Sequence, residues 1–333
     1  MPASSRPANP VLAEVVRSGF VESRHRGSLV VLRPDGSVEF AAGTVGQPMF
    51  PRSSSKPMQA AAMLGRGLDL DGSLLALAAA SHSGEDFHVD GVREILRRAG
   101  LDESALQCPP DLPLDEAMRD ALLRRGERPT RVRMNCSGKH AAMLATCVAA
   151  GWPTASYRDP AHPLQLSIRE TIERLSGEPV AAVGVDGCGA PLLAISVTGL
   201  ARCFRELVRA PAGSAERRVA DAMRQYPAWT SGTNRAEAAV VRAVPGLLMK
   251  SGAEGVCAIA LADGRAAAVK FDDGAQRATV PVMATLLREL VAARPDAYPG
   301  IDLAGLDRLA TTPVTGGGEP VGVVRTAMRS ACT

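Results

Sequence analysis

Lysine is rare in this chain, and most of its copies stand beside serine and glycine. The 333 residues include four lysines against 34 arginines. Lys56, Lys139 and Lys250 lie in the segments Ser-Ser-Ser-Lys, Cys-Ser-Gly-Lys and Lys-Ser-Gly, whereas Lys270 has apolar neighbours. A buried amine can lose its proton near neutral pH, which a guanidinium cannot do. The lysines are therefore the first candidates for acid and base chemistry.

The first candidate pair is Ser53 and Lys56. At the start of a helix this spacing places hydroxyl and amine one turn apart on the same face. A neutral amine can take the proton of a serine hydroxyl, and the positive potential of the helix N-terminus supports the resulting alkoxide. The spacing predicts that Lys56 bonds to Ser53 and activates it as a nucleophile.

A second hydroxyl and amine follow later in the chain. The loop Ser81-His82-Ser83-Gly84-Glu85 comes after an apolar helix, and either Ser81 or Ser83 could take part in catalysis, while Ser83 could also cap the next helix. Lys250-Ser251-Gly252 matches the Lys-Ser/Thr-Gly pattern of penicillin-recognising serine enzymes. Lys270 is the alternative to Lys250. The order of the three elements is more specific than any one of them.

Two cysteines lie in polar, glycine-bearing loops, at Cys136 and Cys188, with Lys139 and His140 close to the first. Their thiolates, with a nearby amine or imidazole, could hold zinc, although two cysteines are fewer than a full ligand set. A thiol activated by Lys139 and His140 is a second possibility, and polar packing around a substrate is a third. Other cysteines, such as Cys147, Cys203 and Cys257, lie among largely apolar residues and read as core.

The elements that would position these residues form three blocks along the chain. Strands are expected near the N-terminus at 11–16, 28–32 and 38–42, and again at 256–261, 266–271 and 321–325, with hairpin turns at Pro34-Asp35-Gly36 and 262–265. Helices are expected between them, at 56–67, 74–80, 91–99, 113–124, 139–150, 163–175 and 215–225, with a last one at 280–293. This order predicts an α/β (α+β) fold with a sheet assembled from both chain ends.

Composition excludes several classes of protein. The net charge is +3, the arginines are scattered and aromatic residues make up 3%, which argues against a nucleic-acid partner. No segment has the roughly 20 apolar residues of a membrane-spanning helix, and residues 1–10 do not resemble a secretion signal. Seven irregularly spaced cysteines do not form a disulfide framework. We expect a cytoplasmic protein with one domain over residues 1–333.

Six ordered blocks of the sequence together resemble the Rhizobium-type L-asparaginases, the asparaginase II family. The blocks are Val15 to Ser23 with His25, Arg52 to Pro57, Ser81 to Glu85, Asn135 to His140, Val185 to Gly189 and Gly252 to Gly255. The resemblance implies a fold similar to serine β-lactamases and serine-dependent glutaminases, with a mostly antiparallel sheet. It also implies a homodimer and the hydrolysis of L-asparagine to L-aspartate and ammonia.

The resemblance further assigns residues to roles. It implies Ser53 with Lys56 as one Ser-Lys pair, Ser81 with Lys250 as a second, and a zinc ion held by Cys136, Lys139 and Cys188 beside the substrate. A lysine ligand must be neutral to bind a metal.

Three neighbours of these residues are candidates for binding substrate. Arg52 could hold a carboxylate through two hydrogen bonds, while His140 and Asp186 could orient the substrate or the metal. The expected reaction is acyl transfer through Ser53. A glutaminase or β-lactam hydrolase of the same fold, and an amino-acid sensor without turnover, are the alternatives.

Overall fold

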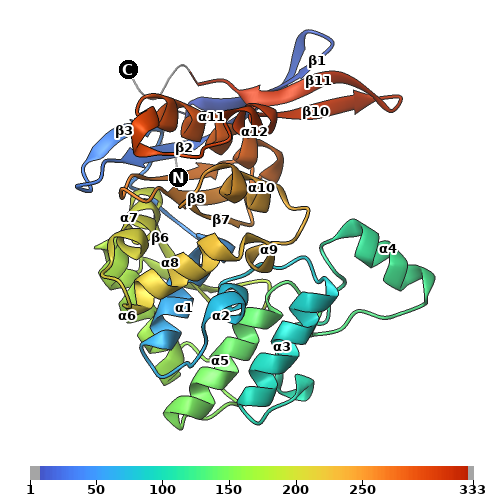
Figure 1. Ribbon diagram of the computed structural model, residues 1–333, viewed down its shortest axis with the longest axis vertical. Coiled ribbons are helices and arrows are strands. Elements are labelled where there is room, and N and C mark those ends of the chain that lie inside the picture. The colour runs from blue at the N-terminus through green and yellow to red at the C-terminus, as the bar shows by residue number, and fades with distance from the viewer. Residues whose placement is uncertain (1–7, 329–333) are drawn as a thin grey trace, which may run out of the picture.

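The computed structural model describes residues 8–328, and it consists of helices packed on a mostly antiparallel sheet (Figure 1). The strands are β1 Val11–Arg17, β2 Phe20–Leu32, β3 Val38–Ala42, β4 Pro48–Met49, β5 Ala182–Val185, β6 Pro191–Ser196, β7 Leu248–Gly252, β8 Val256–Ala260, β9 Ala266–Phe271, β10 Thr311–Gly316 and β11 Glu319–Thr326. The α-helices are α1 Lys56–Leu64, α2 Gly72–Ala78, α3 Asp86–Arg98, α4 Glu116–Arg124, α5 Ser137–Ala150, α6 Pro163–Ser176, α7 Val197–Arg209, α8 Ala215–Gln225, α9 Pro227–Thr230, α10 Ala236–Ala243, α11 Thr279–Ala292 and α12 Leu303–Leu309. Short 3₁₀ turns are η1 Arg52–Ser55, η2 Glu103–Ala105, η3 Gln276–Ala278 and η4 Pro295–Ala297.

The main sheet joins the two ends of the chain. Its eight strands run in the order β10-β11-β1-β2-β9-β8-β7, and β3 also pairs with β2. Neighbouring strands are antiparallel, so β2 binds β1 along its first half and β3 and β9 along its second half. The predicted α+β class and the assembly of the sheet from both chain ends are confirmed.

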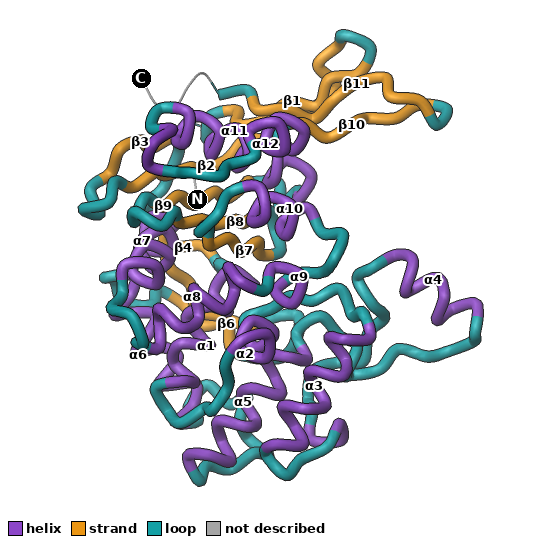
Figure 2. The backbone as a smooth tube through the Cα atoms, viewed as in Figure 1, coloured by secondary structure: helices purple, strands orange, loops and turns teal. Residues whose placement is uncertain are grey.

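The two faces of this sheet support two separate hydrophobic clusters, because successive strand residues point to opposite faces. On β2, Val30 and Leu32 belong to one cluster and Leu29 and Val31 to the other. We call the first the inner core; it continues into α1, α2, α5, α6, α7 and α8. We call the second the outer core; it lies under α10, α11 and α12. Figure 2 shows the strands between these two groups of helices.

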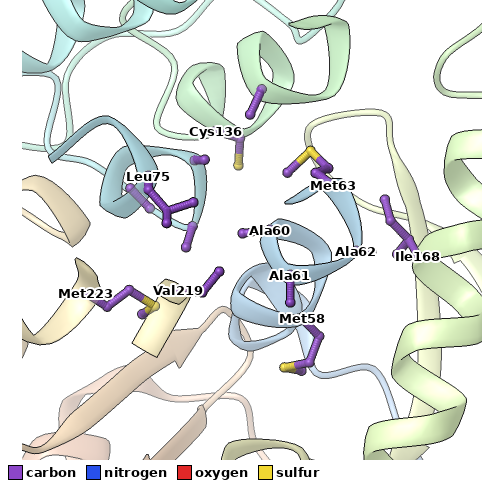
Figure 3. Close-up of a cluster of buried hydrophobic side chains, with 14 of the residues drawn as sticks. Met58, Ala60, Ala61, Ala62, Met63, Leu75, Cys136, Ile168, Val219 and Met223 are labelled. Carbon is purple, nitrogen blue, oxygen red and sulfur yellow. The ribbon is translucent and has the colours of Figure 1, made fainter. Parts of the chain in front are cut away.

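Helix α1 occupies the middle of the inner core. Seven consecutive residues from Pro57 to Met63 are buried, which is possible because five of them are alanine or methionine, the first small and the second flexible enough for close packing. Figure 3 shows Ile168 of α6 on one side of α1 and Val219 and Met223 of α8 on the other. A helix buried on every side fixes the position of its first residue, Lys56, which is 1% exposed.

Several elements differ from the sequence prediction. Strand β2 begins at Phe20 rather than at 28, and α3 begins at Asp86 rather than at 91. Helix α7 and the strands β5 and β6 were not predicted. Lys250 and its two neighbours were expected before the strand at 256, but they form the edge strand β7, paired with β8 from Leu248 to Gly252. The sequence gives little strand signal here because lysine and glycine are depleted in strands.

The sequence-based expectations on membrane-spanning helices and on disulfides can be compared with the described residues. None of the helices between residues 8 and 328 is long and apolar enough to cross a membrane. Six cysteines lie in the same described range and all of them are free and buried. The seventh, Cys332, lies outside the described residues.

Candidate active site

Lys56 reaches away from the serine with which the sequence pairs it. Its Nζ lies 2.6 Å from the carbonyl oxygen of Ala80, 2.9 Å from Ser81 Oγ and 3.1 Å from Cys136 Sγ. Among the described residues it makes no hydrogen bond to Ser53. The prediction assumed a continuous helix from Ser53, but residues 52–55 form the 3₁₀ turn η1 and the α-helix begins only at Lys56. The expected bond between Ser53 and Lys56 is therefore absent in this structure.

Ser81 lies between two lysine amines. Besides Lys56, the Nζ of Lys250 lies 3.0 Å from Ser81 Oγ and 2.8 Å from the carbonyl oxygen of Ser251. The Ser81 backbone is held by the carbonyl oxygen of Thr230, to which its N–H donates at 3.1 Å. Lys56, Ser81 and Lys250 thus form a continuous chain of polar groups, which we call the amine chain.

The two alternatives that the sequence left open have different partners. The hydroxyl of Ser83 donates to Glu85 at 2.6 Å, next to the start of α3. The amine of Lys270 donates to the carbonyl oxygens of Glu254 and Phe271. The structure therefore brings Ser81 and Lys250 together and leaves Ser83 and Lys270 out of this contact.

Lys250 has the electrostatic environment of a base. Burial lowers the pKa of its amine from the ordinary 10.5 to about 7, the positive charge of Lys56 acts in the same direction, and the carboxylate of Glu237 opposes the change. A lysine of this kind is largely neutral slightly above pH 7 and can accept a proton there.

Ser53 differs from the two serines that follow it. Ser54 donates to the carbonyl oxygen of Lys250 and Ser55 to that of Arg52, whereas the Ser53 hydroxyl has no hydrogen-bond partner among the described residues. Ser53 lines a pocket of about 650 Å³ together with Ser81, Asn135 and Lys250. Its hydroxyl is therefore available to a ligand in that pocket.

A glycine allows these two segments to meet. A side chain at Gly252 would lie 2.4 Å from the carbonyl oxygen of Pro51 and 2.9 Å from Ser54 Oγ. Only glycine permits this close approach of the β7 and η1 backbones. The Gly of Lys250-Ser251-Gly252 thus positions Ser53 beside the amine chain.

Cys136, Lys139 and Cys188 also come together, in the buried interior next to Lys56. Cys136 precedes α5, Lys139 lies in its first turn, and Cys188 lies in the loop between β5 and β6. The Lys139 amine donates to Cys188 Sγ at 3.0 Å. Burial opposes the charge of Lys139, but the negative charges of Cys188, Cys136 and Asp186 raise its pKa.

The pKa values of the two thiols of this cluster are shifted in opposite directions. The hydrogen bond from Cys188 and the charges of Lys56 and Lys139 lower the pKa of Cys136 despite its burial. The same hydrogen bond raises the pKa of Cys188. Of the two thiols, Cys136 is therefore the more readily deprotonated.

The residues expected to bind substrate lie around this cluster. Arg52 Nε donates to Asp186 Oδ1 at 2.8 Å, and the Arg52 guanidinium lies 3.8 Å from Glu254. Arg52 also has φ +51, in the left-handed region that non-glycine residues seldom adopt. His140 Nδ1 lies 2.7 Å from the hydroxyl of Tyr157. None of Arg52, His140 and Asp186 is among the described residues that line the 650 Å³ pocket.

A sequence model of L-asparaginase II matches residues 13–326. The chain belongs to the L-asparaginase II family. Members of this family are asparaginase-type amidohydrolases, and the resemblance found in the six sequence blocks is confirmed. No curated protein matched the chain.

Several solved structures match the chain at low identity. The native form of Mglu matches at 16% identity and a TM-score of 0.43, over 78% of this chain and 62% of that one. A beta-lactamase from Mycobacterium bovis matches at 16% identity and a TM-score of 0.42, over 75% of this chain and 88% of that one. The chain spans less than two thirds of the length of Mglu.

The zinc ion that the asparaginase II resemblance implies can be compared with the residues present. The described residues contain no group of three or more His, Cys, Asp or Glu side chains that could hold a metal, so any site here needs the Lys139 amine as well. Two thiols and an amine are donors that zinc accepts. In addition, the Nε2 atom of His140 is buried without a hydrogen-bond partner. This donor set fits a zinc ion.

Sequence reasoning missed three residues in or near the candidate site, of which Asn135 and Glu237 line the pocket. Glu85 accepts hydrogen bonds from Ser83 Oγ and from the backbone N–H of Thr233 at 2.9 Å, which fixes the loop before α10. Glu237 of α10 influences Lys250, and Asn135 lines the pocket. Glu85 and Asn135 lie in the quoted sequence blocks, so a signal was present for them. Glu237 had none, because its contact depends on the packing of α10 against β7.

Proposed function

We propose that the protein hydrolyses L-asparagine to L-aspartate and ammonia. The observation that carries the proposal is the Ser81 hydroxyl held between the amines of Lys56 and Lys250, in the same pocket as the free hydroxyl of Ser53. A binding site needs no such proton path, whereas amide hydrolysis needs a base for the nucleophile and an acid for the leaving nitrogen.

The proposed nucleophile is Ser53. Its oxygen attacks the side-chain amide carbon of the bound substrate. The proton of the Ser53 hydroxyl passes into the amine chain at the same time. The three acceptors of the Lys56 amine match the three donors of an ammonium group. The vacant position for the proton is therefore at Lys250, reached through Ser81. This differs from the sequence-based expectation that Lys56 is the neutral base.

The same chain returns the proton. Ser81 donates to the departing nitrogen and recovers a proton from Lys250, so that ammonia leaves and an ester on Ser53 remains. Backbone N–H groups of the pocket wall would stabilise the oxyanion. Water then cleaves the ester, which releases aspartate and restores the hydroxyl of Ser53.

Cys136, Lys139 and Cys188 would hold the zinc ion of this proposal. When bound, zinc would supply positive charge that orients or polarises the substrate. Arg52 and Asp186 hold each other in place next to this cluster, so their proposed role is to shape the acyl end of the site together with His140.

The test measures ammonia release from asparagine by the purified protein. We expect turnover by the wild type and a loss of at least ~100-fold in Ser53→Ala, because removal of a nucleophile abolishes acyl transfer. Ser55→Ala is the matched control from the same turn and should keep most of the activity. Acid quenching during turnover should yield an acylated peptide that contains Ser53.

Other outcomes identify the rivals. Ammonia from glutamine but not asparagine, or hydrolysis of a chromogenic β-lactam alone, would assign another amidase activity. Asparagine binding without ammonia would indicate a sensor. An acyl group on Ser81, with full activity in Ser53→Ala, would contradict the proposed nucleophile. The homodimer remains a prediction, which light scattering can test.

A further inference from the structure

The pocket is larger than the proposed substrate requires. Its volume of about 650 Å³ lies within the range of roughly 300–1,000 Å³ typical of pockets that enclose drug-sized ligands. Asparagine is much smaller than such ligands. A molecule whose amide carbon lies beside Ser53 would therefore leave a substantial part of the pocket unfilled.

The additional space is bounded by an apolar wall, which we define as Val241, Val280 and Leu309. These residues come from α10, α11 and α12, and all three line the pocket. Each is partly buried and packs with its other side against the outer core. Apolar side chains held in this way are rigid and favour an apolar group over water.

The orientation of the bound substrate decides which of its ends lies beside the apolar wall. The leaving nitrogen must lie near Ser81 and Lys250, since it takes its proton there. Lys250 in turn lies near Glu237 of α10, the helix that carries Val241. The apolar wall thus lies on the side of the leaving group.

Among the described residues, three charged side chains besides Lys250 line the pocket, those of Arg235, Glu237 and Arg277. Arg277 donates to the ring of His25, and the other two neutralise each other. Arg235 and Glu237 both line the pocket, and their side chains form an ion pair at 3.5 Å. A charged substituent would therefore find no unpaired partner in the Arg235–Glu237 pair. An uncharged apolar substituent would instead contact the apolar wall. The chemistry of this end of the pocket favours an amine that carries an apolar group.

We propose that the site also hydrolyses β-amides of aspartate whose amide nitrogen bears an apolar group such as benzyl. The inference rests on the proposed asparaginase function and extends it from ammonia to larger leaving amines. The Ser53 oxygen forms the ester bond and the carbon–nitrogen bond breaks. The amine departs with the proton from the amine chain, and water cleaves the ester to aspartate.

The test compares Nδ-benzyl-L-asparagine with asparagine as substrates of the full chain. We expect equal amounts of benzylamine and aspartate, separated by chromatography, with a kcat/KM within about 10-fold of that for asparagine, because the wall offsets the bulk of the substituent. Hydrolysis of asparagine without hydrolysis of the benzyl amide would overturn the inference. No hydrolysis of either would instead contradict the proposed function.

Variants then locate the benzyl group. Val241→Trp fills the space beside the wall and should lower the ratio of benzyl-amide to asparagine turnover at least ~10-fold. Val280→Phe tests the same wall from α11 in case the first variant folds poorly. Val148→Trp, at an exposed position of α5 outside the pocket, is the matched control and should leave the ratio unchanged. An unchanged ratio in both wall variants would also overturn the inference.

Discussion

Lys250 and Lys139 are both buried, yet the pKa values of their amines are shifted in opposite directions. Around Lys250 burial and the charge of Lys56 prevail, and the pKa falls to about 7. Around Lys139 the thiols and Asp186 prevail over burial, and the pKa rises. Burial alone does not determine the protonation of a lysine; the charges within a few ångströms decide whether it serves as a base or as a counter-ion.

Removal of the Lys250 amine is expected to have the largest effect on activity. Lys250→Met keeps a chain of similar volume but removes the vacant proton position, so we expect kcat/KM for asparagine to fall about 10³-fold. Lys270→Met is the matched control on the neighbouring part of the sheet and should stay within about threefold of wild type. An equal loss in both variants would show that Lys250 acts through stability alone.

The cluster of Cys136, Lys139 and Cys188 is tested by metal titration. Zinc binding requires thiolates from Cys136 and Cys188 and a neutral amine from Lys139, so we expect the release of a number of protons per ion that includes the one carried by Lys139. Calorimetry in buffers of different ionisation enthalpy measures this number. Lys139→Met should release about one proton fewer and bind more weakly. The absence of zinc uptake by the metal-free protein would contradict the proposed cluster.

The smallest expected effect is on the pH dependence of the reaction. If deprotonated Lys250 is the base, kcat/KM should rise with pH and level off above an apparent pKa near 7. The Glu237 carboxylate favours the charged amine and so raises the pKa of Lys250. Glu237→Gln should therefore move the rising limb to lower pH, by less than about one unit. A shift toward higher pH would contradict this arrangement.

The fold was largely predictable where the sequence periodicity is strong. Helix α6 coincides with the expected segment because Pro163 occupies its first turn and Gly177 ends it. The hairpin of β8 and β9 was also predicted. The edge strand β7 was not, since its residues become a strand only by pairing with β8.

The residues that form the site could be predicted from the sequence better than the contacts between them. Ser53, Lys56, Ser81 and Lys250 all lie in one place, as expected from their motifs. Local spacing suggested that Lys56 bonds to Ser53, but the 3₁₀ turn at 52–55 prevents this and Lys56 bonds to Ser81 instead. Contacts such as that between Ser81 and Lys250, 169 residues apart, depend on how the sheet and helices pack, which no local pattern encodes.

The titration of Lys250 itself is the most direct test of its proposed role as the base. Four lysines permit ¹⁵N labelling of every Nζ atom with few overlapping NMR signals. We predict one signal that titrates near pH 7 and is missing in Lys250→Met. Four signals that all titrate above pH 10 would contradict the account, because no neutral amine would then be available to Ser81 at neutral pH.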